Sequence, residues 1–118
     1  MEKVFVYKPR AVALIGEDEK IDTGFTGTIK VAIPDYTTRL GIIKDHTPKD
    51  GEDQDFAAMG EKMFKTVNTY VKEVDFKHPD CDEPLTSVED LGMFDVGTAV
   101  IFDLGNMIMK GWSPNPKS

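Results

Sequence analysis

Two histidines and one cysteine are the residues of this chain best suited to hold a metal ion or to act as a nucleophile. His78 and Cys81 are separated by two residues, and His46 lies far from both in the sequence. A structural zinc site needs four ligands, usually in two close pairs, and these three residues fall short of that number. A catalytic cysteine needs a base and an electropositive setting, and no motif around Cys81 supplies them. We therefore expect no metal centre and no cofactor.

Acidic residues cluster in two short runs, 50–55 and 80–83. An EF-hand calcium loop requires glycine at its sixth position and glutamate at its twelfth. Counted from Asp50, the sixth position is Asp55, so the pattern indicates solvated loops. The sequence contains neither a Gly-x-Ser-x-Gly motif nor a phosphate-binding P-loop. We expect a protein that is not an enzyme, although a small acidic enzyme or regulator is left open.

Large apolar side chains are concentrated near the C-terminus, where residues 91–118 include three of the six methionines and the single tryptophan. Methionine side chains adapt to varied partners, and tryptophan is common at the energetic centres of interfaces. We predict a partner-binding surface formed by Phe102, Met107, Met109 and Trp112. Burial of these side chains in the protein core is the alternative, and the sequence leaves it open.

The elements that would position these side chains begin with strands. Three N-terminal segments, 4–7, 11–15 and 25–33, are rich in β-branched and aromatic residues. In the third segment, apolar residues alternate with polar ones over nine positions. That period of two predicts a half-buried strand, and the three segments together predict a small antiparallel sheet with one face in water.

Three helices are predicted after the sheet, at residues 36–44, 54–74 and 96–109. Asp35 is placed to cap the first of them, because its carboxylate can accept from free backbone amides. Apolar side chains recur at helical spacing in the first two helices. They are Tyr36, Leu40 and Ile43 in the first, and Phe56, Met59, Met63, Val67, Tyr70 and Val74 in the second.

The segment that precedes the last helix contains a capping-box pattern, in which Thr86 precedes Glu89 by three residues. Within that helix, Gly97 and Gly105 lower the helix propensity and would let another backbone approach closely. The chain is therefore predicted to be of the α+β class, with a small N-terminal antiparallel β-sheet followed by three helices. We expect a single domain over residues 1–112 and a polar C-terminal tail over 113–118.

The composition is that of an acidic globular protein, with a formal net charge of -7 and a pI near 4.7. A nucleic-acid-binding protein needs a basic face, and the lysines and arginines are scattered among acids, so we expect no nucleic-acid partner. A single cysteine excludes an intrachain disulfide and suits a reducing cytoplasm. No stretch has the pattern of a signal peptide or of a membrane span, so we expect a cytoplasmic protein without a membrane partner.

Two blocks of the chain form a familiar pattern. Residues 29–44 contain an alternating strand, a proline and a Tyr-x-x-Arg-Leu helix that ends in lysine. Residues 87–117 run from a short acidic motif through a long apolar segment to a glycine, an aromatic residue and a lysine. In these blocks the chain resembles the small tail assembly chaperones of long-tailed bacteriophages. The strand-like N-terminus departs from that family, whose members are often mostly helical.

The resemblance implies a non-enzymatic role in the cytoplasm of the infected bacterium. Such chaperones bind the tape measure protein, keep it soluble and help the tail tube form around it, and a longer form recruits the tail tube subunit. The rival hypothesis is a structural virion protein, such as a tail or head-tail connector subunit, in which the N-terminal strands join sheets between neighbouring copies. The sequence leaves homo-oligomer formation open.

Overall fold

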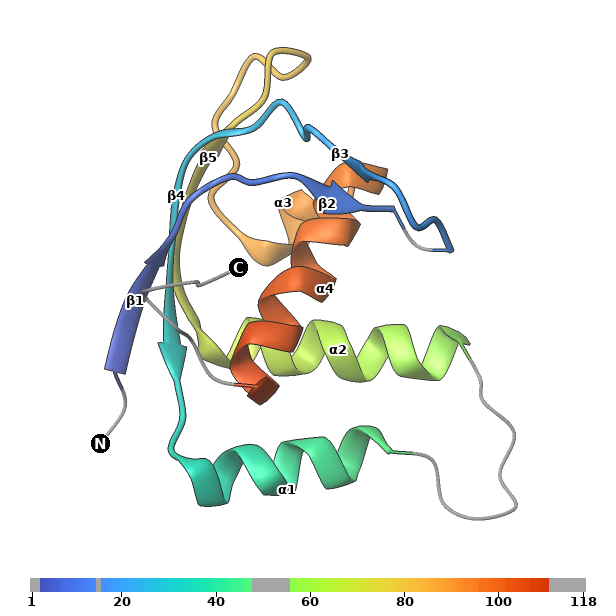
Figure 1. Ribbon diagram of the computed structural model, residues 1–118. Helices are drawn as coiled ribbons and strands as arrows, with labels where there is room; N and C mark the ends of the chain where they lie inside the picture. The colour runs from blue at the N-terminus through green and yellow to red at the C-terminus, as the bar shows by residue number, and fades with distance from the viewer. Residues whose placement is uncertain (1–2, 15, 48–55, 111–118) are drawn as a thin grey trace.

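The computed structural model describes residues 3–14, 16–47 and 56–110, and within them the fold is of the α+β class, as predicted. Figure 1 labels the described strands and helices, which are numbered in their order along the chain. The strands are β1 (Lys3–Tyr7), β2 (Val12–Ala13), β3 (Lys20–Ile21), β4 (Thr26–Ile33) and β5 (Val71–Lys77). The helices are α1 (Tyr36–His46), α2 (Phe56–Tyr70), α3 (Val88–Leu91) and α4 (Asp95–Lys110).

The main sheet is antiparallel and has the strand order β1-β4-β5, with β4 in the centre. The predicted alternation holds in the first part of β4, where Ile29 and Val31 are buried and Lys30 is exposed, whereas Ala32 and Ile33 at its end are both buried. Gly27 of the same strand has a φ of 112°, and a Cβ atom there would collide with the carbonyl oxygen of Asp75 in β5. Glycine is therefore required at this position of β4.

The second predicted helix is too long at its C-terminal end, because residues 71–77 form strand β5 instead. Tyr70 and Val74 fit a helical stripe, which is why the sequence pattern carried the helix through to residue 74. In the structure, Val74 and Phe76 alternate into the core, and Val74 pairs with Ile29 of β4. Pairing with the central strand, which lies far away in the sequence, overrides the local helical pattern.

The last predicted helix is the centre of the fold. Helix α4 packs against α1, α2, α3, β2 and β4, and eight of its sixteen residues are buried. Gly97 lies against the backbone of Leu91 in α3, as expected for a glycine that permits close approach. Gly105 instead lies against the side chain of Met63 in α2.

Helices α1 and α3 each begin after a capping residue, and the second of these caps lies one residue later than predicted. Asp35 caps α1 as predicted, accepting a hydrogen bond of 2.9 Å from the Thr38 amide, and this bond holds the pKa of the Asp35 carboxyl below its usual range. Before α4, the N-cap is Ser87 rather than Thr86, and its hydroxyl accepts from the Asp90 amide. This cap begins the short helix α3, so the described residues contain four helices where the sequence predicted three.

Helix α1 lies at one end of the molecule, and the small pair of β2 and β3 lies at the other (Figure 1). The predicted strand 11–15 contributes β2, which pairs with β3 rather than joining the main sheet. No helix in the described part of the chain is both long enough and apolar enough to cross a membrane. The predicted C-terminal tail at 113–118 lies outside the described residues.

Candidate partner-binding surface

The predicted binding residues of the C-terminal region lie on different sides of α4. Met107 is buried, with 7% of its surface exposed, while Phe102 and Met109 are partly buried and pack against the core. At about 100° per residue, Phe102 and Met109 lie on one side of the helix and Met107 lies about 140° away from Phe102. Trp112 lies outside the described residues. Partner binding by these four residues stays a prediction.

Phe102 borders a cavity of about 310 Å³ between α4 and the segment that contains β2. The carboxylate of Asp103 at this cavity accepts hydrogen bonds from the Tyr7 hydroxyl at 2.7 Å and from the Arg10 guanidinium at 2.8 Å through each of two nitrogens. Burial, together with the negative charge of Asp103, raises the pKa of the Tyr7 hydroxyl. These bonds join the N-terminal strand to the central helix, so the cluster is a structural tie.

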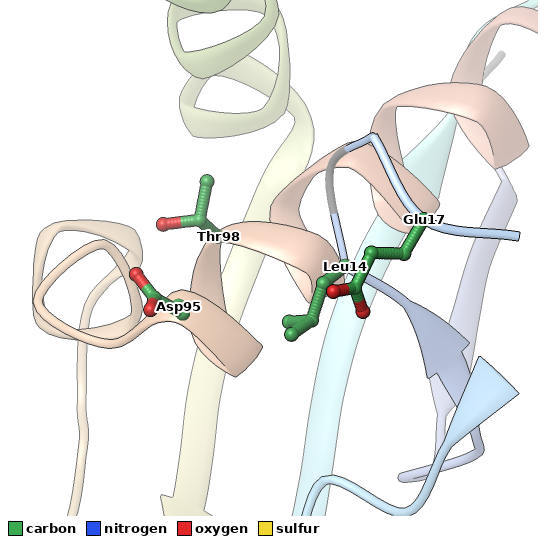
Figure 2. A pocket seen from close by; sticks show the side chains of 4 residues that line it. All are labelled: Leu14, Glu17, Asp95 and Thr98. Atoms are coloured by element: carbon green, nitrogen blue, oxygen red, sulfur yellow. The ribbon is translucent and has the colours of Figure 1, made fainter. Parts of the chain in front are cut away.

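A second cavity, of about 290 Å³, is lined by Leu14, Glu17, Asp95 and Thr98 (Figure 2). The two carboxylates come from the β2–β3 connection and from the first turn of α4. The Thr98 hydroxyl donates to the Phe94 carbonyl at 3.0 Å, which leaves it engaged with the backbone of its own helix. Both acids are exposed to solvent, and this shallow site brings no nucleophile or base to them.

The side chains of both histidines are engaged in local hydrogen bonds. His78 accepts at Nδ1 from the Asp80 amide, so its Nε2–H faces the Thr23 carbonyl 3.2 Å away. The other histidine, His46, is hydrogen-bonded to the Thr66 hydroxyl at 2.9 Å, and burial lowers its pKa. Across residues 3–14, 16–47 and 56–110, no three His, Cys, Asp or Glu side chains gather in a way that could hold a metal ion.

The surface feature that the sequence did not single out is helix α1. No residue of this helix is buried, and its three large apolar side chains are markedly exposed: Tyr36 at 66%, Leu40 at 46% and Ile43 at 39%. Their spacing predicts a helix here, which the structure confirms, and the three side chains are exposed to solvent. We call Tyr36, Leu40 and Ile43 the α1 stripe.

Helix α1 is nevertheless held in place on the body of the protein. Ile42 packs against the core, and His46 bonds Thr66 of α2. The ammonium group of Lys62 donates to the Asp45 carbonyl at 3.1 Å, which also complements the negative end of the α1 dipole. The α1 stripe is therefore a fixed apolar surface, presented by a helix that is anchored on its other side.

Three other large apolar side chains are exposed among the described residues, namely Val4, Val6 and Met93. Val4 and Val6 lie on the face of β1 opposite to the core, and Met93 lies in the connection between α3 and α4.

No family model, curated protein or solved structure matches this chain.

Proposed function

We propose that this protein is a phage tail assembly chaperone, which binds the tape measure protein and keeps it soluble during tail formation, without enzymatic activity. The exposed α1 stripe is the observation that carries the proposal. It falls within residues 29–44, the first block in which the chain resembles the tail assembly chaperones. Large exposed apolar side chains grouped on one helix face are typical of a protein-binding surface.

The rest of the molecule is compatible with a binding role. The acidic net charge of -7 would keep a complex with an apolar client in solution. Phe102 and Met109, which are partly exposed on α4, are proposed as further contacts together with Trp112, and the tail tube subunit as a second partner. The proposed place of action is the cytoplasm of the infected bacterium, and no cofactor is required for this role.

Co-expression with the tape measure protein tests the proposal directly. The tape measure protein alone should be largely insoluble, and with this chain it should enter the soluble fraction and co-purify with it. An unrelated acidic protein of similar size serves as the control for a general effect of co-expression. A client that stays insoluble with both proteins, and that does not co-purify, would rule out the chaperone function.

A structural virion protein is the second candidate, and β1 is the feature that favours it. This strand stands at the end of the β1-β4-β5 order, and its side chains Val4 and Val6 are 55% and 47% exposed. An apolar outer face on a terminal strand could pack against a neighbouring copy in an assembled tail. Mass spectrometry of purified virions separates the two candidates, because a chaperone is absent from the finished particle and a subunit is present.

A further inference from the structure

We propose that the α1 stripe is the docking site for the client, and that it binds a helical segment whose apolar face is flanked by acidic residues. The identity of the client comes from the proposed function, on which this assignment rests. The chemistry of the bound segment, in contrast, follows from the side chains that surround the stripe.

The stripe has the shape that another helix needs. At about 100° per residue, Tyr36, Leu40 and Ile43 fall within about 60° of one another around the helix. They extend over about 10 Å of its length, at a rise of about 1.5 Å per residue. A partner helix with apolar residues at the same i, i+4 and i+7 spacing would cover all three side chains over two turns.

Cations border the stripe on both sides. Arg39 lies about 40° beyond Ile43 in one direction, and Lys44 lies about 40° beyond Leu40 in the other. The Arg39 guanidinium stands 5.6 Å from the centre of the Tyr36 ring, at the edge of the apolar surface. Its Nε atom is buried and has no hydrogen-bond partner among the described residues. The rim of the stripe is therefore positive on each flank.

The acids and the histidine of this helix do not reverse that charge. Asp45 lies on the opposite side of α1, about 180° from Tyr36. His46 has a pKa lowered by burial, which favours its neutral form at neutral pH. Asp35 stands at the N-terminal end, and its carboxylate is engaged by the Thr38 amide. Acidic residues of a partner would thus be accommodated beside Arg39 and Lys44, away from Asp35.

A second copy of this chain is the less suitable occupant. In an antiparallel pair of α1 helices with the two stripes in contact, the twofold axis would lie near residue 40, so Arg39 would face Arg39 across the interface. In a parallel pair, each Arg39 would face a Lys44 of the other copy. Like charges at such positions oppose pairing, so both arrangements disfavour a symmetric dimer through α1.

The overall charge of -7 repels an acidic partner at long range. Salt at physiological concentration screens exposed charges beyond about 8 Å. The cations next to the stripe would meet acids at contact distance, where screening is weakest. The cations beside the stripe therefore determine which helical segments bind there, while the net charge of the whole protein lowers the rate of association with an acidic partner.

Two synthetic helical peptides of about 20 residues test the assignment. Both carry leucines at i, i+4 and i+7, and one has glutamates at every flanking position where the other has lysines. Titration of the isotopically labelled protein, followed by NMR, should show the largest shift changes in the amides of residues 36–44. We expect the glutamate peptide to bind about tenfold more tightly than the lysine peptide.

Matched variants locate the binding. Leu40→Gln combined with Ile43→Gln should weaken binding of the glutamate peptide by about tenfold or more, because most of the apolar contact is lost. Lys44→Glu should remove most of the preference between the two peptides. Met93→Gln, which changes an exposed apolar residue remote from α1, should change nothing. Equal binding of both peptides, or full binding by the double variant, would overturn the assignment.

The same variants distinguish a wrong docking site from a wrong function. If the wild type solubilises the tape measure protein and the double variant does so equally well, the function stands and the α1 assignment falls. If the wild type fails to solubilise it, the chaperone function falls. In that case, selective binding of the glutamate peptide at α1 would still establish the surface for another acidic, helical partner.

Discussion

Asp103 ties the first strand to the central helix, and the energetic role of its carboxylate can be measured. The Tyr7 side chain is fully buried, and its hydroxyl donates to Asp103. Asp103→Ala would leave that hydroxyl without its acceptor, so we expect a loss of about 2–3 kcal/mol in the free energy of unfolding. Tyr7→Phe removes the donor itself and should cost about 1 kcal/mol. Urea unfolding of both variants measures the difference, and equal costs would contradict the proposed tie.

The raised pKa of Tyr7 predicts a loss of stability in alkaline solution. Burial is the largest cause, and the nearby charge of Asp103 adds to it. The unfolded chain loses the tyrosine proton near pH 10, while the folded protein keeps it. This contribution is complete below pH 10 and declines as the pH rises above it, by up to about 1.4 kcal/mol per pH unit. Tyr7→Phe should show a shallower decline in unfolding experiments, whereas parallel curves would contradict it.

At the scale of elements, the sequence predicted best those features that depend on nearby residues. The alternation in the first part of β4, the Asp35 cap and the position of α4 all follow from local patterns, and all are present in the structure. Strand β5 could not be read in the same way, because its conformation depends on pairing with β4 some forty residues earlier. The α1 stripe was missed for a related reason, since helical spacing identifies an apolar face but does not reveal what covers it.

The contact between α3 and α4 requires a glycine, and substitution tests this. A Cβ atom at Gly97 would press on the backbone of Leu91, which cannot move without shifting a helix. We expect Gly97→Ala to lower the free energy of unfolding by about 1–2 kcal/mol, in spite of the higher helix propensity of alanine. Gly60→Ala in α2 is the matched control, because no atom of the described residues outside the helix backbone lies within 4 Å of a Cβ atom there, and it should stabilise by about 0.5–1 kcal/mol. Thermal unfolding of both variants provides the comparison.

At the scale of the whole molecule, apolar residues are divided between a core built around α4 and a surface on α1. The core joins all three strands of the main sheet to helices α2, α3 and α4. Helix α1 adds only a partly buried Ile42 to it. The residues that hold the fold together and those proposed to meet a client are thus largely separate, so stability and binding should respond to different substitutions.

Met107 and Leu40 test that separation, because both are large apolar residues on helices. Met107 is 7% exposed, so Met107→Ala should leave a cavity and cost about 2–5 kcal/mol in the free energy of unfolding. Leu40 is 46% exposed, and Leu40→Gln should change the free energy of unfolding by no more than about 0.5 kcal/mol. Chemical denaturation gives both values, and solubilisation of the tape measure protein gives the functional readout. Loss of solubilisation in Leu40→Gln at unchanged stability would assign that residue to binding, whereas a comparable loss of stability in both variants would place α1 within the cooperative core.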